Sequence, residues 1–418
     1  MVWSFTLLII TLWLIRRGWS RPSPRFPLLC LLLIALFVRL LPGMVLVQNS
    51  NYDIESYSLV ANHVVAGEDV YSSPDVLGRH PYLPFEMYWM GLAKWISLQL
   101  HGQFTTVVKL LPIVADAIIS LVIFIILRRS LPEHQAFFGS LVYALNPVPI
   151  MVSAYHGQFD SVALLFLVLG VWQASRSDLY AGGWMGLGIL AKSWPVLALP
   201  SLIISFNSNK QRWVILITSC AVPILGVIVY VFRFHARFVT VILNALSYNH
   251  GIGVWGYTYL LRLLGYLLPT WWAQVFSAIY SNARFITLAI LIVIWWLVAR
   301  KEHLVAGVLT ILVGFLAFTH AFAIQYLIWL IPFAILSQEY RWLWVYTLSG
   351  FSYMFLAYNT LILNPGITNL LPMPLADQAI IIPASLPVWL ITVAWVVDRM
   401  KKVRLAIKIN EELETASP

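Results

Sequence analysis

The sequence predicts an all-α membrane protein, a polytopic bundle of transmembrane helices that forms one domain over residues 1–418. Hydrophobic residues make up 61% of the chain and charged residues only 10%, far below the share of about a quarter in soluble domains. Apolar runs of about 20 residues, enough to cross a bilayer, recur throughout the chain. The 19 Trp and 19 Tyr fit the aromatic belts of membrane–water interfaces.

The apolar runs predict about eleven spans. The first lacks a cleavage site, so we interpret it as a retained helix and not as a signal peptide. Residues 27–340 would form the core, 341–400 would add C-terminal helices, and 401–418 would form a cytoplasmic tail. The expected spans are 2–16, 27–48, 105–128, 135–152, 161–175, 213–232, 284–300, 303–319, 325–338, 341–360 and 379–398.

One apolar segment, 180–206, is interrupted and predicts a broken re-entrant hairpin. Glycines at 182, 183, 186 and 188 are followed by the break Lys192-Ser-Trp-Pro195, a pattern that suggests two half-helices. Irregular backbone at membrane depth is tolerated where protein or a cavity surrounds it.

The distribution of basic residues predicts the orientation in the membrane. Seventeen of the 26 Lys and Arg fall on one side of the threaded chain, which the positive-inside rule assigns to the cytoplasm. The N-terminus is then outside and the C-terminus inside, and the long loops 49–104 and 233–283 are outside. Within the first loop, residues 53–66 and 84–100 have helical apolar spacing and predict interfacial helices.

Composition also excludes some classes of partner. Basic residues form no stripe interleaved with aromatics, so we expect no nucleic acid. Cys30 and Cys220 lie inside apolar runs, which argues against a disulfide or a metal site. We expect no cofactor and no obligatory metal, because no strong ligand motif completes the i, i+4 pair His156 and Asp160.

Histidines and acidic residues gather on the predicted outer side. A transporter would place its key polar groups near the midplane, between repeats, so this one-sided distribution favours an enzyme that works at the outer surface. The residues are His63, His80, His101, His156, His235, His250, His320, Asp53, Glu55, Glu68, Asp69, Asp75, Glu86 and Asp160.

Five motifs follow one another between residues 51 and 332. They are Asn51-Tyr-Asp53-Ile-Glu55-Ser-Tyr57 with His80-Pro-Tyr82-Leu-Pro84, Lys109-Leu-Leu-Pro-Ile-Val-Ala-Asp116, Asn146-Pro147 with His156-Gly-Gln158-Phe-Asp160, Gly186-Leu-Gly-Ile-Leu-Ala-Lys192-Ser-Trp-Pro195, and Thr319-His320 with Gln325-Tyr326-Leu-Ile-Trp329-Leu-Ile-Pro332. In this order they resemble the GT-C glycosyltransferases, in particular family 87 and the polyprenol-phosphate-mannose enzymes. The resemblance covers roughly residues 27–340. Ala323-Ile324 departs from the Ser-Pro that is usual before Gln325.

The resemblance implies an inverting glycosyltransferase of GT-C fold. It would move a sugar, most often mannose in these families, from a polyprenyl-phosphate donor to a lipid-linked or glycolipid acceptor at the non-cytoplasmic face. Asp53 would be the general base, because a carboxylate can accept the proton of the attacking hydroxyl. Asp53 could instead be the N-cap of helix 54–66, a position that Asp favours.

Other residues are expected to bind the substrates. The candidates for sugar and acceptor binding are Glu55 (also the second candidate base), His80, Tyr82, His156, Gln158, Asp160, His250 and Trp255. The candidates for contact with the donor phosphate, where charge develops as it leaves, are Arg39, Lys192, His320 and Gln325. Arg39 could instead snorkel to the surface, and Lys192 could pair with a structural carboxylate. Lys109 and Asp116 are interpreted as structural.

Three other classes of function stay open: a transporter or lipid flippase, a polysaccharide polymerase or ligase, and a non-catalytic scaffold. A transporter would show paired broken helices in corresponding halves, whereas only one broken hairpin is visible. The expected partners are the lipid-linked donor, the acceptor and the membrane. The expected location is a bacterial plasma membrane, with the site facing away from the cytoplasm; the sequence does not distinguish this membrane from that of an endoplasmic reticulum.

Overall fold

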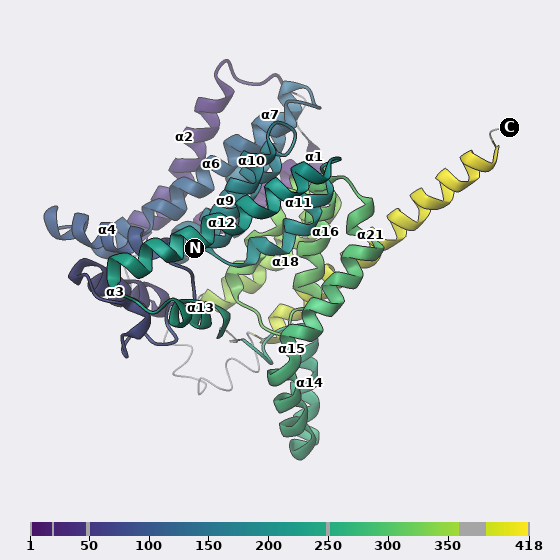
Figure 1. Ribbon diagram of the computed structural model, residues 1–418. Helices are drawn as coiled ribbons and strands as arrows, with labels where there is room; N and C mark the ends of the chain where they lie inside the picture. The colour runs from purple at the N-terminus through teal and green to yellow at the C-terminus, as the bar shows by residue number, and fades with distance from the viewer. Residues whose placement is uncertain (1, 19–20, 47–50, 248–250, 359–381, 417–418) are drawn as a thin grey trace. The chain divides into compact units, whose positions relative to one another are not determined.

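The computed structural model describes residues 2–18, 21–46, 51–247, 251–358 and 382–416, and these are helical almost throughout (Figure 1). In these ranges no β-strand forms, and Ile252 and Ala321 make an isolated bridge. The all-α prediction is therefore confirmed. The chain divides into two compact units, Met1–Tyr248 and Asn249–Pro418, so the single domain over 1–418 stays a prediction.

The first unit contains α1 to α13. Its helices and turns are α1 Val2–Arg17, α2 Pro27–Leu40, the π-helical turn η1 Leu41–Leu46, α3 Tyr52–Ala66, the 3-10 turn η2 Val70–Ser72, α4 Glu86–Gln99, α5 Phe104–Val108, α6 Leu110–Leu127, α7 Glu133–Leu145, α8 Pro147–Ile150, the π-helical turn η3 Met151–His156, α9 Asp160–Gln173, α10 Asp178–Ala191, the 3-10 turn η4 Trp194–Ala198, α11 Leu199–Ile204, α12 Asn209–Phe234 and α13 Phe238–Ser247.

In the part of the second unit that the structure describes, further helices follow. They are α14 Gly256–Leu267, α15 Pro269–Leu297, the 3-10 turn η5 Ala299–Lys301, α16 Leu304–Phe318, the 3-10 turn η6 Ile324–Ile328, α17 Leu330–Leu336, α18 Tyr340–Tyr358 and α21 Ile382–Ala416. Within this unit α16 packs against α15, α17 and α21, and α18 also packs against α21.

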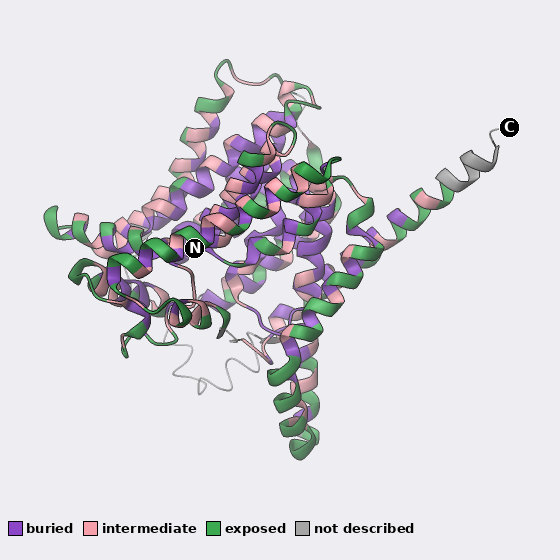
Figure 2. Cartoon of the chain, viewed as in Figure 1, coloured by how far each residue is buried: buried purple, intermediate pink, exposed green. Residues whose placement is uncertain are grey.

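The core of the first unit lies around α6 and α9. α6 packs against α2, α7 and α9, and α10 lies between α9 and α12. Figure 2 shows buried residues along the inner helices and exposed residues on the outer ones. Outside this core, α3 and α4 pack against each other. They match the two interfacial helices predicted at 53–66 and 84–100, with ends within two residues.

The predicted hairpin at 180–206 is broken where expected, but its glycines have another role. α10 runs without interruption through Gly182 and Gly186 and ends at the extended residue Lys192. A Cβ on Gly182 would overlap the Thr218 side chain, and one on Gly186 would lie 2.7 Å from Val222 Cβ on α12. Small residues four apart allow such close helix contact in membranes. The glycines therefore pack α10 on α12, and the break comes only after them.

Several helices have the length and composition of membrane spans. Among the described residues four helices pass on both counts, and a fifth span is added if the pair Glu133–Leu145 and Pro147–His156, bent by 41°, is one span. The four are Pro27–Met44, Phe104–Leu127, Asn209–Phe234 and Pro269–Lys301. Other apolar helices are shorter, for example Leu304–Phe318. The total of eleven spans therefore stays a prediction.

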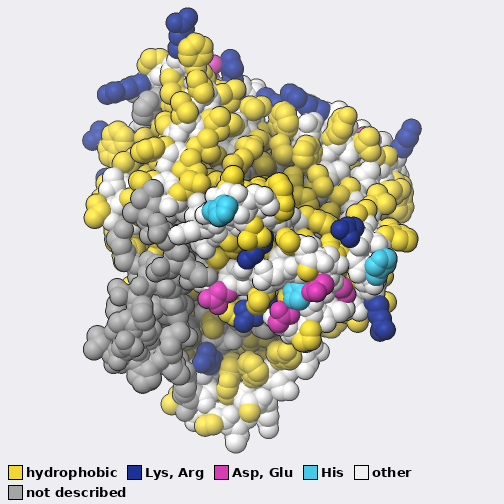
Figure 3. Space-filling model, turned by 90° about the vertical axis from the view of Figure 1, so that its left-hand side faces the viewer, with side chains coloured by type: hydrophobic (Ala, Val, Ile, Leu, Met, Phe, Trp, Pro, Cys, Tyr) yellow, Lys and Arg dark blue, Asp and Glu magenta, His cyan; other side chains and the backbone are white. Residues whose placement is uncertain are grey.

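The long helix α12 carries a face suited to lipid. Trp213, Ile217, Leu225, Val229 and Phe232 on this helix are all more than half exposed. In a soluble monomer so large an exposed apolar surface would be unusual, but in a bilayer lipid covers it. Figure 3 shows one face of the molecule, on which apolar side chains cover broad areas and histidine and acidic side chains gather in one region.

Two expected boundaries differ from the structure. Residues 269–283 belong to α15, which begins at Pro269, although the sequence places them in an outer loop before a span at 284–300. α21 continues to Ala416, past the expected end of the last span at 398. In α21 the residues beyond 398 are rich in Lys, Arg and Glu, which are good helix formers, so they do not end the helix.

Candidate active site

Asp53 lies in the first turn of α3, and another residue caps that helix. The side chain of Asn51 accepts a hydrogen bond from the backbone N–H of Ile54, and Asn51 Nδ2 donates to the carbonyl oxygen of His156. The alternative that Asp53 is the N-cap is therefore wrong. Because Asn51 satisfies the free backbone N–H, the carboxylate of Asp53 is available for other contacts.

Two side chains from a distant turn hold the Asp53 carboxylate. His156 Nε2 lies 2.8 Å from Asp53 Oδ2, and Gln158 Nε2 donates to the same oxygen at 2.6 Å. Among the described residues none hydrogen-bonds to Oδ1, and the side chain is 35% exposed. One carboxylate oxygen is thus fixed and the other can accept a proton.

Both contacts lower the pKa of Asp53. Burial alone would raise this pKa, but the hydrogen bond and charge of His156, the charge of Lys192 and the hydrogen bond from Gln158 outweigh it. The carboxylate is therefore ionised at neutral pH, the state that a general base requires.

The turn that presents His156 and Gln158 depends on Gly157. A break at Asn146-Pro147 leads into the π-helical turn η3, which ends at Gly157 in the left-handed conformation with φ 88°. A Cβ there would lie 3.0 Å from Lys109 Cγ and 3.1 Å from Ile54 Cδ1. Only glycine fits both the backbone conformation and the space.

We expect Gly157→Ala to destabilise the protein more than a matched glycine variant. Gly67 also has a left-handed backbone, with φ 75°, but a Cβ added to Gly67 would meet no atom within 4 Å. Gly67→Ala should therefore lower the free energy of unfolding by only about 1–2 kcal/mol, from backbone strain. Gly157→Ala should lower it further, because its Cβ would also press on Lys109 and Ile54. Equal shifts of the two variants in thermal unfolding would contradict this assignment.

Behind Asp53 lies a second, fully buried polar layer. Gln158 Oε1 accepts hydrogen bonds from Tyr57 Oη at 3.1 Å and from Lys192 Nζ at 3.3 Å. Lys192 Nζ also lies 2.6 Å from Asp160 Oδ2 and 4.6 Å from the centre of the Tyr82 ring. The sequence allowed Lys192 to contact either the donor phosphate or a structural carboxylate. The structure contains the second of these contacts, with Asp160. A role toward the donor phosphate stays a prediction.

His80 joins this layer as a neutral ring. It is buried, stacks edge-on against Tyr82 with ring centres 5.6 Å apart, and neither ring nitrogen has a hydrogen-bond partner among the described residues. Burial and the charge of Lys192 lower the pKa of His80 to about 3. The ring therefore offers one donor and one acceptor at neutral pH.

Arg39 is engaged elsewhere in the core. Arg39 Nε lies 2.7 Å from Asp116 Oδ2, and both side chains are fully buried. Asp116 also accepts hydrogen bonds from Tyr143 Oη and Ser153 Oγ. Snorkelling to the surface is therefore wrong for Arg39, whereas the prediction that Asp116 is hydrogen-bonded inside the bundle is confirmed. The position of Arg39 gives no support to a phosphate contact.

Three other predicted site residues are Glu55, His250 and Trp255. Glu55 is exposed on α3, and His250 lies outside the described residues. Trp255 is fully buried in the second unit, stacked on Phe322 at 3.8 Å between ring centres, with its Nε1 donating to the carbonyl oxygen of Leu316. This packing gives Trp255 a core position instead of an open surface for a sugar.

His320 and Gln325 also belong to the second unit. His320 Nδ1 lies 2.9 Å from Thr287 Oγ1, and burial together with the charge of Arg284 lowers the pKa of His320 to about 4. The ring is therefore neutral at pH 7, and His320 is buried. Gln325 is buried in η6, which follows the extended residue Ala323.

Sequence reasoning missed two residues beside the site. Arg79 lies with its guanidinium 4.8 Å from the centre of the Tyr52 ring and donates to Ser56 Oγ at 3.3 Å, so a cation flanks the α3 turn that carries Asp53. Glu86 is fully buried next to the Lys192 layer. No motif marks either residue, because each depends on contacts between segments far apart in sequence.

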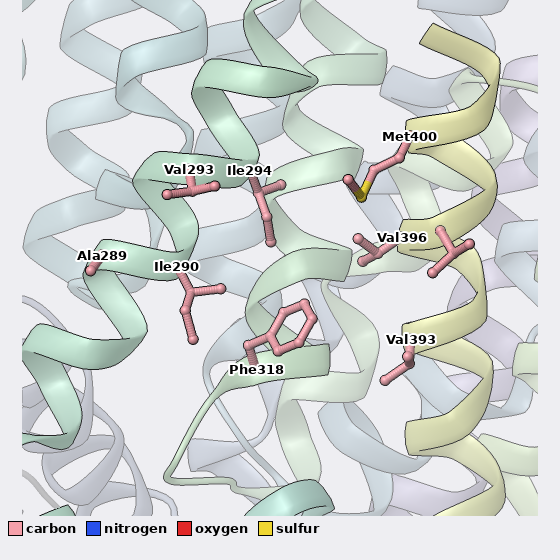
Figure 4. A pocket seen from close by; sticks show the side chains of 9 residues that line it. Ala289, Ile290, Val293, Ile294, Phe318, Val393, Val396 and Met400 are labelled. Atoms are coloured by element: carbon pink, nitrogen blue, oxygen red, sulfur yellow. The ribbon is translucent and has the colours of Figure 1, made fainter. Parts of the chain in front are cut away.

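The described residues also bear on metal and lipid binding. They contain no group of three or more His, Cys, Asp or Glu arranged to hold a metal ion. In the second unit α15, α16 and α21 line an open pocket of about 330 Å³ (Figure 4). It is lined by Ala289, Ile290, Val293, Ile294, Phe318, Val393, Val396, Val397 and Met400. With no titratable side chain, this lining offers contact to hydrocarbon and no chemistry.

Comparisons with known proteins agree with the resemblance seen in the motifs. The family described as dolichyl-phosphate-mannose-protein mannosyltransferase matches residues 84–236. GPI mannosyltransferase 1 of Debaryomyces hansenii is 25% identical over 225 residues, 51% of this chain and 50% of that protein. GPI mannosyltransferase 1 of Candida albicans is 30% identical over 106 residues, 24% of this chain and 26% of that protein.

The chain thus spans half or less of the length of these curated relatives. Among solved structures, the archaeal oligosaccharyltransferase AglB from Archaeoglobus fulgidus, in complex with an inhibitory peptide and a dolichol-phosphate, aligns with a TM-score of 0.39 and 13% identity. That alignment covers 88% of this chain and 55% of AglB.

Proposed function

This chain is related to the GT-C mannosyltransferases, and from that relationship we propose that it is an inverting mannosyltransferase of the membrane. The observation that supports this most directly is the carboxylate of Asp53, ionised, partly exposed and fixed through one oxygen by His156 and Gln158. A membrane-borne enzyme that uses a lipid-linked sugar needs such a base where the lipid headgroup lies.

In the proposed reaction Asp53 acts as the general base. The oxygen of the acceptor hydroxyl attacks the anomeric carbon of the sugar, and its proton passes to Asp53 Oδ1. The bond between the anomeric carbon and the phosphate oxygen breaks, and its electron pair leaves with the polyprenyl phosphate. Attack from the face opposite the phosphate inverts the anomeric configuration. No metal or cofactor enters this scheme.

Arg79 is the cation best placed to meet the leaving phosphate. It is only partly buried and lies against Tyr52 and Ser56, which flank Asp53 on α3. A planar guanidinium suits a phosphate group. Lys192 and Arg39 are each paired with a buried carboxylate, so we assign them to holding the site. His320 and Gln325 remain candidates for donor contact.

The proposed substrates are a polyprenyl-phosphate mannose as donor and a lipid-linked or glycolipid acceptor. The names of the relatives support mannose and a glycolipid acceptor. Both relatives with similar sequences are named GPI mannosyltransferase 1, and GPI is a glycolipid. We place the site on the non-cytoplasmic face of a multi-pass membrane protein, because the basic loops fall on the other side of the threaded chain. A bacterial plasma membrane is the proposed location.

The proposal is tested by transfer of radiolabelled mannose from polyprenyl-phosphate mannose to membrane glycolipids by the purified protein in lipid nanodiscs. We expect a labelled glycolipid whose anomeric configuration, determined by NMR, is opposite to that of the donor. If donors carrying mannose, arabinose or glucose all give no product, the proposed function is wrong and the transporter hypothesis takes its place. Retention of configuration would exclude the single-displacement mechanism.

A further inference from the structure

Glu86 is a buried carboxyl group that the proposed reaction does not use. It is the first residue of α4, its side chain has no solvent exposure, and neither carboxyl oxygen has a hydrogen-bond partner among the described residues. A buried polar group without a partner destabilises the folded protein, and more strongly when it is charged. Such a group is retained more readily where it has a role.

The charges around Glu86 decide its protonation state. Lys192 from the break after α10 and Asp160 from α9 both interact electrostatically with Glu86, and Tyr57 and Tyr71 lie in its field. The buried cation of this layer, Lys192, is already 2.6 Å from Asp160. An ionised Glu86 would therefore be a second buried carboxylate with no cation of its own, which is strongly unfavourable.

Burial accordingly raises the pKa of Glu86 to about 8; Lys192 partly opposes this shift and Asp160 adds to it. The N-terminus of α4 favours an anion but does not outweigh the burial. At neutral pH Glu86 is thus a neutral carboxylic acid, and above pH 8 it becomes a carboxylate in the field of Lys192.

We propose that Glu86 is a positioning residue that acts on the Asp53 base through Lys192, leaving the contacts of Lys192 undisturbed while it is protonated and disturbing them when it is ionised. This inference rests on the proposed function. The connection runs through two hydrogen bonds, from Lys192 Nζ to Gln158 Oε1 at 3.3 Å and from Gln158 Nε2 to Asp53 Oδ2 at 2.6 Å. If Lys192 turns toward an ionised Glu86, Gln158 loses the contact that orients its amide toward Asp53.

The test is the pH dependence of sugar transfer by the wild type and by Glu86→Gln in lipid nanodiscs. For the wild type we expect kcat to fall by about tenfold per pH unit above pH 8, with KM for the donor changing less. Glu86→Gln cannot ionise, so its kcat should vary less than about threefold over the same range. The same alkaline fall in both proteins would overturn the proposal.

A matched control and a second measurement separate this role from general destabilisation. Glu133 pairs with Arg128 at the surface, and Glu133→Gln should keep the alkaline fall of the wild type. Infrared spectroscopy should detect a protonated carboxyl at pH 7 that disappears above about pH 9 and is missing in Glu86→Gln. Transfer without this band overturns the role of Glu86 alone, whereas the band without any transfer overturns the proposed function and with it the positioning role.

Discussion

Asp53→Asn should reduce sugar transfer by about 10²–10⁴-fold, the usual contribution of a general base. The asparagine amide keeps the shape of the side chain and can still contact His156, but it cannot take the proton of the acceptor hydroxyl. The loss should therefore appear in kcat, with little change in KM for the polyprenyl-phosphate mannose donor. Initial rates at several donor concentrations, with the purified proteins at equal amounts in nanodiscs, measure both constants.

The matched control is Glu55→Gln, the neighbouring carboxylate on the same helix. Glu55 is exposed and contacts none of the groups that fix Asp53, so its variant should retain most of kcat. A larger loss for Glu55→Gln than for Asp53→Asn would transfer the role of base to Glu55. The wild-type rate should also persist to acid pH, because the lowered pKa of Asp53 keeps it ionised until the pH falls through that pKa.

The second large effect concerns the buried pair Arg39 and Asp116. Arg39→Met should lower the free energy of unfolding by about 3–5 kcal/mol, because it leaves a buried carboxylate without its counter-charge. Asp116 keeps hydrogen bonds from Tyr143 and Ser153, which soften the loss but do not replace the charge. Unfolding in mixed micelles of increasing denaturing detergent measures the change.

Two further variants test the cause of that loss. The double variant Arg39→Met with Asp116→Leu removes both charges and should recover a large part of the stability. Arg128→Met breaks the exposed pair with Glu133, whose side chains are 57% and 37% exposed, and should change stability by less than about 1 kcal/mol. If the double variant is as unstable as Arg39→Met, packing and not the unpaired charge dominates.

The sequence predicts the parts of this protein that depend on local pattern. The all-α class follows from apolar runs, and the break at Lys192 follows from its own short motif. The approximate limits of α3 and α4 follow from helical spacing. The predicted helix ends are wrong where polar residues lie inside a helix that continues, as in α15 and α21.

The partners of charged residues cannot be predicted in the same way. Asp53 and His156 are 103 residues apart in the chain, and no pattern in the sequence predicts their contact, although both belong to motifs of one family. For Arg39 and Lys192 the sequence could not distinguish a phosphate from a carboxylate as partner, since either compensates a buried cation. Glu86 reads as an ordinary polar residue at a helix start, and only its complete burial distinguishes it.

The fixed amide of Gln158 has a consequence for the basicity of the site. Its two ends are not interchangeable, because the NH₂ group faces the Asp53 carboxylate and the oxygen faces Lys192 and Tyr57. The amide therefore acts as a spacer that keeps an ammonium from forming a direct ion pair with the base. A direct pair would hold the carboxylate too tightly to accept a proton, whereas a neutral spacer transmits only part of the positive field. Gln158 thus keeps Lys192 out of direct contact with the carboxylate, and its own hydrogen bond adds to the larger effect of His156 on the basicity of Asp53.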